Sequence, residues 1–194
     1  MKDEQITDSV LLRALDTAIR EAFSEMLPGV PLELQHDAQP SHTIGDAAIV
    51  ALSGQLCGSL IVLTPRASTV LLARRIAGDL VDDDDGEMAE NGLLTQLEQD
   101  SIRELSNRVG CIFAGAVTSV GRRLDPTFPI FVCGQDINIV AESDHELAVT
   151  VLLDSVIRID TRAFLSVPKS GSSREERIRE LERLREELLA GESE

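Results

Sequence analysis

Three polar residues recur at helical spacing in the segment DSIRELSNRVG, residues 100–110. At about 100° per residue, with Asp100 taken as zero, Glu104 falls near about 40° and Asn107 near about 340°, a strip roughly 60° wide. The opposite side of this helix collects an apolar stripe, which consists of Ile102, Leu105, Val109, Ile112 and Ala116. Because such a stripe packs a helix onto a sheet, we expect the polar strip to face outward.

A carboxylate and an amide one turn apart on a rigid helix suit entry into the active site of another protein. An amide can donate to and accept from one water, and so fix it in line with a phosphorus atom without changing protonation state. The carboxylate can pair with a lysine beside the phosphoryl group. The sequence shows neither a nucleophile with a histidine base nor a phosphate-binding loop, so a partner would have to hold the phosphorylated group.

The same strip can also be interpreted as a solvated helix face. Arg103 and Arg108 flank it, and Arg108 follows Glu104 by four residues, the favourable order for an ion pair. Exposed pairs of this kind contribute little to stability and are common on surfaces. The spacing alone leaves both interpretations open.

The strip, together with a downstream proline, resembles the signature of the CheC/CheX/FliY phosphatases of bacterial chemotaxis. That signature is Asp or Ser, three residues, Glu, two residues, Asn, and a proline about 22 residues further on. Asp100, Glu104 and Asn107 fit it, and Pro129 follows after 21 residues. CheC-like members carry two such motifs, whereas the corresponding part of the first helix here lacks the asparagine. It reads Thr17, Glu21 and Ser24, so the single motif looks most like CheX.

The resemblance implies a hydrolase that removes the phosphoryl group from the aspartate of a CheY-like response regulator. Asn107 would orient the attacking water, Glu104 would contact the regulator's lysine, and Asp100 would be a supporting residue. Arg103 and Arg108 are further candidates for support or binding. No metal or other cofactor is expected on this chain, because the Mg²⁺ would belong to the regulator, and a homodimer is expected. The alternative is a non-catalytic module that binds a response regulator or a flagellar-motor component.

Patterns along the chain predict an α+β fold, with a mainly antiparallel sheet of about six strands packed against three helices. Apolar residues at three- and four-residue intervals predict helices over 8–27, 68–80 and 92–124, the first capped by Asp8 and the second by Ser68 or Thr69. Alternating or continuous apolar runs predict strands over 30–34, 47–54, 57–65, 128–140, 146–155 and 156–164. A helix precedes a hairpin in both parts, so an internal pseudo-repeat is possible.

The chain divides into a main domain and a charged appendage. Residues 1–167 are expected to form one CheX-like phosphatase domain, and residues 168–194 a linker followed by an amphipathic helix rich in Glu and Arg. The apolar stripe of that helix consists of Ile178, Leu181, Leu184 and Leu188. A solvated helix packed on its own domain is the simpler interpretation, and a short coiled coil with another chain is the alternative.

Composition narrows the classes of function. With 194 residues, 43% of them hydrophobic, the chain can fill one globular domain. A net charge of −16 and only five aromatic residues, all Phe, argue against binding to nucleic acid. Neither a long uncharged apolar stretch nor a signal-peptide pattern occurs, so we expect a cytoplasmic protein without a membrane span.

Cysteines and the acidic run 82–85 give no strong metal-site pattern. Cys57, Cys111 and Cys133 are odd in number and far apart, which favours reduced, buried thiols. The acidic run fits only part of a calcium-loop pattern, so a solvated loop is favoured over a divalent-cation site.

Overall fold

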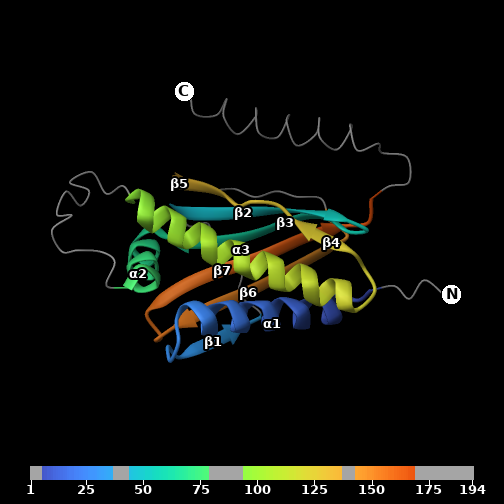
Figure 1. Cartoon of the computed structure of the whole chain (residues 1–194), viewed down its shortest axis with the longest axis horizontal. Helices are drawn as coiled ribbons and strands as arrows, with labels where there is room; N and C mark the ends of the chain where they lie inside the picture. The colour runs from blue at the N-terminus through green and yellow to red at the C-terminus, as the bar shows by residue number, and fades with distance from the viewer. Residues whose placement is uncertain (1–5, 37–43, 79–93, 137–142, 169–194) are drawn as a thin grey trace, which may run out of the picture.

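The computed structural model describes residues 6–36, 44–78, 94–136 and 143–168. Its helices are α1 (Asp8–Met26), α2 (Arg66–Ala77) and α3 (Gln96–Ser119). The strands are β1 (Leu32–Gln35), β2 (Ile44–Gly54), β3 (Cys57–Pro65), β4 (Leu124–Pro126), β5 (Ile130–Asp136), β6 (His145–Leu153) and β7 (Ile157–Ser166). α1 and α3 cover one face of a single sheet (Figure 1), so the predicted α+β class is confirmed. The acidic run and the predicted C-terminal helix lie outside the described residues.

All strand pairs of the sheet are antiparallel, in the order β1-β6-β7-β3-β2-β4, with β5 also paired to β2. Alternate residues of β2, among them Ala48, Val50 and Leu52, belong to the core beneath the helices. β4 is a strand that the sequence did not predict. It has three residues, too few to show an alternating pattern, and it forms by pairing with Leu52–Gly54 at the end of β2.

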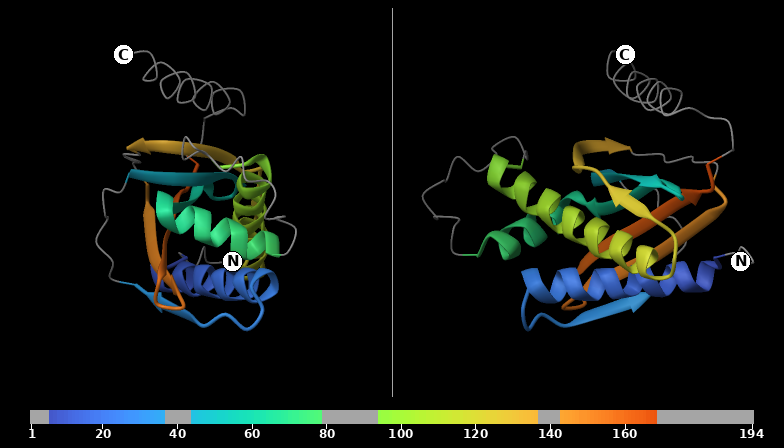
Figure 2. Two further views of the ribbon diagram at one scale, coloured as in Figure 1. Left: turned by 90° about the vertical axis from the view of Figure 1, so that its left-hand side faces the viewer. Right: turned by 45° about the vertical axis from the view of Figure 1, so that its right-hand side comes forward.

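The sheet supports the predicted internal pseudo-repeat. We call α1, β1, β2 and β3 the first half, and α3, β5, β6 and β7 the second half. In each half a helix precedes a short edge strand and an antiparallel hairpin. Each edge strand pairs with the hairpin of the other half, β1 with β6 and β5 with β2, while β3 and β7 meet in the middle. Exchange of the two halves therefore leaves this strand pattern unchanged, and the two views of Figure 2 show α1 and α3 crossing on the same side of the sheet.

Burial of the apolar stripe of α1 anchors the first half. Leu11, Leu15 and Ile19 are fully buried, and each such side chain contributes about 1.5–3 kcal/mol relative to exposure. The helix ends at Met26, just before Pro28 and Gly29. Its N-cap is Thr7, and Asp8 is the first helical residue, so the predicted Asp8 cap is one residue late.

The start of α2 also differs from the prediction. Pro65 precedes the helix, and its fixed φ suits entry into a helix without any side-chain cap. Thr69, one of the two predicted caps, instead lies inside the helix and donates its hydroxyl proton to the backbone oxygens of Thr64 and Pro65. Neither Ser68 nor Thr69 is therefore the cap.

α3 begins at a capping box and passes close to the sheet. Thr95 Oγ1 accepts from the Glu98 backbone N–H, and the Glu98 carboxylate accepts from the Thr95 backbone N–H. Arg74 of α2 donates to the same, nearly buried carboxylate at 3.3 Å. Further along, a Cβ at Gly110 would lie 3.0 Å from Val50 Cγ1, so glycine allows the close approach of α3 to β2. These contacts fix the helix that carries the polar strip.

Candidate functional site

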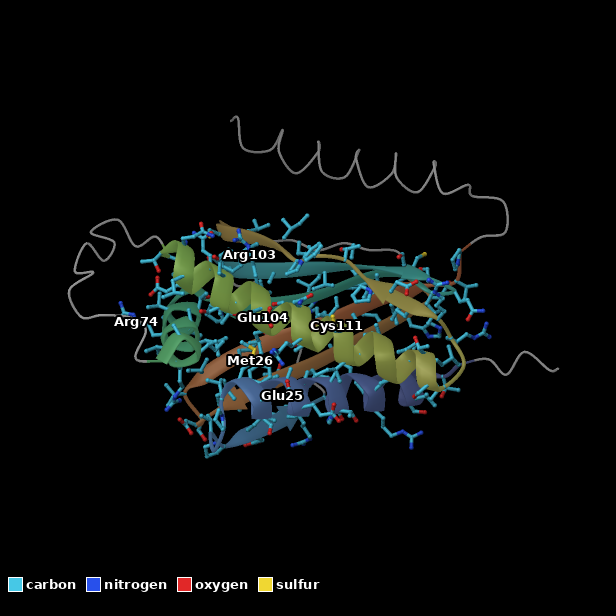
Figure 3. The ribbon with its side chains drawn as sticks, in the orientation of Figure 1. Glu25, Met26, Arg74, Arg103, Glu104 and Cys111 are labelled. Atoms are coloured by element: carbon cyan, nitrogen blue, oxygen red, sulfur yellow. The ribbon has the colours of Figure 1, made fainter. Side chains whose placement is uncertain are left out.

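The polar strip of α3 faces away from the sheet. Asp100 and Glu104 are exposed and Asn107 is half-buried, whereas Ile102 and Leu105 are buried in the core. The predicted outward orientation is therefore confirmed. Side chains from both helices gather here, with Arg103, Glu104 and Cys111 on α3 and Glu25 on α1 (Figure 3).

Asp100 is held at the start of the strip by two donors. Gln96 Nε2 lies 2.9 Å and Arg103 Nη1 lies 2.7 Å from Asp100 Oδ1. Both hydrogen bonds favour the charged form and lower the pKa of the Asp100 carboxyl, and the bond from Gln96 has the larger effect. The Arg103 guanidinium lies 6.0 Å from the centre of the Phe131 ring on β5. Asp100 thus orders Arg103 between α3 and the neighbouring strand.

Glu104 shares a guanidinium with a carboxylate of the other helix. Arg108 Nε donates to Glu104 Oε1 at 3.0 Å, which confirms the ion pair predicted from their spacing. Arg108 Nη1 also donates to Glu25 Oε2 of α1, at 2.5 Å. The bonds from Glu25 and then Glu104 raise the pKa of Arg108. Glu25 was not predicted, because it lies 83 residues away in sequence and no local spacing links it to α3.

Within the described residues, the side chain of Asn107 makes one hydrogen bond. Cys111 Sγ lies 3.8 Å from Asn107 Oδ1, so the thiol can donate to the amide oxygen. Among the described residues, no acceptor is bonded to the Nδ2 protons, so the amide retains two donors and an acceptor lone pair for a ligand.

The three cysteines are free, as expected, but the burial predicted for them was wrong. Cys57 and Cys133 are only half-buried and Cys111 is exposed. Cys111 follows Asn107 by one helical turn and so lies on the same outward edge, as its helical angle indicates.

Pro129 lies immediately before β5 and is half-buried. The strand that it precedes pairs with β2 through Ile130 and Phe131, and Phe131 is the ring beneath Arg103. The structure therefore connects the proline of the motif to α3 through the Arg103–Phe131 contact.

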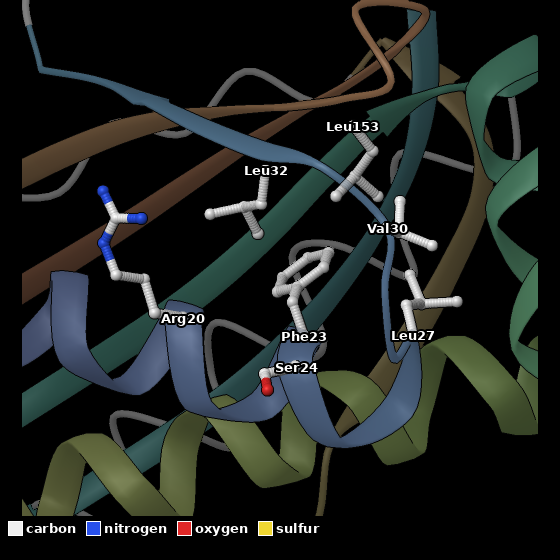
Figure 4. Close-up of a pocket in the computed structure, with 7 residues that line it drawn as sticks. All are labelled: Arg20, Phe23, Ser24, Leu27, Val30, Leu32 and Leu153. Atoms are coloured by element: carbon white, nitrogen blue, oxygen red, sulfur yellow. The ribbon is translucent and has the colours of Figure 1, made fainter.

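A hollow of about 240 Å³ lies against α1 and not beside the polar strip (Figure 4). It is lined by Arg20, Phe23, Ser24, Leu27, Val30, Leu32 and Leu153, none of which belongs to α3. Asp100, Glu104 and Asn107 stand on a helix edge outside this hollow. Their placement suits presentation to a large partner better than enclosure of a small substrate.

Within residues 6–36, 44–78, 94–136 and 143–168, no group of three or more His, Cys, Asp or Glu side chains could hold a metal ion. In the same segments, no helix combines the length and the apolarity needed to cross a bilayer.

No family model matches the sequence, and a search of curated proteins gives no match. Solved structures do match. CheX in the CheX–CheY–BeF3–Mg²⁺ complex from Borrelia burgdorferi has a TM-score of 0.62 and 18% identity, over 80% of this chain and 97% of that chain. CheX from Desulfovibrio desulfuricans matches with a TM-score of 0.63 and 17% identity, over 80% of this chain and 99% of that chain. FliY from Thermotoga maritima matches with a TM-score of 0.56 and 11% identity, over 83% of this chain and 87% of that chain. The resemblance inferred from the motif is thus confirmed in the architecture, and the chain has the fold of the CheC/CheX/FliY family.

Proposed function

We propose that this protein accelerates hydrolysis of the phosphoaspartate on a CheY-like response regulator. The observation that carries the proposal is the outward strip of Glu104 and Asn107 on α3, in a fold shared with a CheX that was solved in complex with CheY. That complex contains Mg²⁺ and BeF3, which is a chemical mimic of a phosphoryl group. The proposal includes a cytoplasmic location, a homodimer, and a Mg²⁺ that belongs to the regulator.

In this mechanism α3 enters the regulator's active site along the Glu104–Asn107 edge. Asn107 contributes a neutral amide, whose N–H groups and free lone pair can hold a water in line with the phosphorus atom. Glu104 contributes a carboxylate for the regulator's lysine, and this pair sets the depth and register of entry. Asp100 and Arg103 keep the beginning of the edge ordered. The helix is anchored by its capping box and its core stripe, so the amide is presented on a rigid element.

The direct test is phosphate release from candidate regulators that have been phosphorylated by a small-molecule donor. Wild-type protein should shorten the lifetime of the phosphorylated state of its cognate regulator. Asn107→Ala should reduce this acceleration on the order of 10- to 1000-fold, because the water loses its orienting group. Glu104→Ala should chiefly raise KM. Ser24→Ala, at the corresponding position on α1, is the matched control and should behave like wild type. Equal activity of Asn107→Ala and wild type would refute the proposal.

The second candidate is a binding module without catalytic activity. It is favoured by the fact that both groups already have internal partners, Glu104 with Arg108 and Asn107 with Cys111. This candidate predicts that the protein binds a BeF3-activated regulator while phosphate release stays at the regulator's own rate. It also predicts that Glu104→Ala weakens the complex. Parallel measurements of binding and phosphate release on the same regulator separate the two functions.

A further inference from the structure

Arg108 lies between two carboxylates that come from different helices. Its Nε donates to Glu104 on α3 and its Nη1 donates to Glu25 on α1, at 3.0 and 2.5 Å. All three side chains are 44–55% exposed, so the ion pairs can exchange with an incoming charge. Arg108 is thus the cation that a partner's lysine would have to replace at Glu104.

The charge of this group depends on Glu25. Two carboxylates and one guanidinium leave one negative charge at the edge, whereas Glu104 and Arg108 alone would be neutral. A lysine that approaches the three-residue group is attracted, and after it binds Glu104 the guanidinium still has a carboxylate partner. Without Glu25, the same lysine would have to displace Arg108 from its single partner and leave an unpaired cation beside it.

Glu25 also has a special place in the pseudo-repeat. Glu21 corresponds to Glu104 and Ser24 to Asn107, so the next residues, Glu25 and Arg108, correspond to each other. Because Glu25 and Arg108 correspond to each other and are in contact, they lie where the two halves meet. The first half, which has no asparagine at its own edge, therefore supplies a carboxylate to the edge of the second half.

We propose that Glu25 is a positioning residue for regulator docking, because it holds Arg108 and so keeps Glu104 available to the regulator's lysine. This inference rests on the proposed function and adds to it a residue outside the sequence motif. Glu25 acts on docking and does not touch the reacting atoms, so it affects the affinity for the regulator and not the chemical step.

The test compares Glu25→Gln with Glu21→Gln, which removes the same charge from the same exposed face of α1. Glu21 has no hydrogen bond or ion pair among the described residues, so it is the matched control for net charge. For Glu25→Gln, KM for the phosphorylated regulator and Kd for its BeF3-activated form should rise about two- to fivefold. The maximal rate should stay within about twofold of wild type, because Asn107 is unchanged.

A double variant separates positioning from general damage. Glu25→Gln combined with Arg108→Gln removes the competing guanidinium and should return KM and Kd to wild-type values. Loss of helix packing would not be rescued in this way. If Glu25→Gln matches Glu21→Gln, or if the double variant fails to recover, the inference is wrong while the proposed function stands. If wild-type protein neither binds an activated regulator nor accelerates phosphate release, the proposed function fails, and the inference fails with it.

Discussion

The two halves of the molecule hold their helices in corresponding places on the sheet but present different chemistry. Both helices contain the sequence Ile-Arg-Glu, at 19–21 in α1 and at 102–104 in α3. Three residues after the glutamate, α1 has Ser24 and α3 has Asn107. A hydroxyl on a short side chain cannot extend two N–H donors and a carbonyl toward a water as an amide can. The comparison shows that the architecture offers two helix edges, and that only the edge of α3 carries the amide on which the proposed function depends.

The largest expected difference between the halves concerns their packing. Phe113 of α3 is fully buried, so Phe113→Ala should lower the free energy of unfolding by about 3–5 kcal/mol. Phe23 of α1 lines the surface hollow. Phe23→Ala should therefore lower the free energy of unfolding by less, because the space it leaves joins a hollow that water can enter. Urea unfolding of both variants measures the difference. Equal losses of unfolding free energy would show that Phe23 and Phe113 are packed equally tightly.

The next effect tests whether the asparagine can be moved between the halves. Asn107→Ser gives α3 the residue of α1 and should reduce regulator dephosphorylation about 10- to 1000-fold. Adding Ser24→Asn should not restore the activity. α1 ends at Met26, and the counterpart of Cys111 there is Pro28, which has no proton to donate to the amide. Recovery of phosphate release by the double variant would show that the first edge is functionally complete.

Helix caps give a smaller contrast. Thr95 at the start of α3 forms both bonds of a capping box, whereas the Thr7 side chain makes no cap bond to the backbone of α1. Thr95→Ala should therefore lower the free energy of unfolding by about 0.5–2 kcal/mol, and Thr7→Ala by much less. Thermal or urea unfolding of the pair checks this. A larger loss for Thr7→Ala would mean that the cap geometry does not govern the stability of these helix starts.

The smallest effect is one of pH at Asp100, whose counterpart Thr17 does not titrate. The pKa of Asp100 is lowered from its ordinary 3.8 by hydrogen bonds from Gln96 and then Arg103. A lowered pKa in the folded state means that the stabilisation is present above the unfolded pKa and is lost as pH falls through the folded value. Carboxyl NMR should therefore show Asp100 titrating below 3.8, and Gln96→Ala should move its midpoint upward. An unchanged midpoint would exclude Gln96 as the main cause.

Much of the fold could be predicted because its signals are local. Apolar residues at helical intervals located α1 and α3, and alternation located most strands, since these elements bury one face each. The outward direction of Glu104 and Asn107 followed from the same periodicity. β4 could not be predicted, because its three residues are extended only through pairing with β2.

The rest of the site depends on contacts between distant segments. Glu25 reaches Arg108 only because the two helices meet, and Phe131 lies beside Arg103 only because β5 pairs with β2. The exposure of Cys111 was missed for a different reason. Its small and apolar neighbours indicated burial, whereas its helical angle relative to Asn107 indicates the outward edge, and the structure agrees with the angle.

The contact between Glu25 and Arg108 also constrains how the chain could have diverged from a duplicated ancestor. In a perfectly repeated protein, the positions of Glu25 and Arg108 would carry the same residue. Two glutamates or two arginines in contact there would repel each other. Opposite charges remove that conflict and make each helix dependent on the other. Gene conversion that copied one helix over its counterpart would recreate a like-charge contact, so the two helices have to differ at this point for the ion pair to exist.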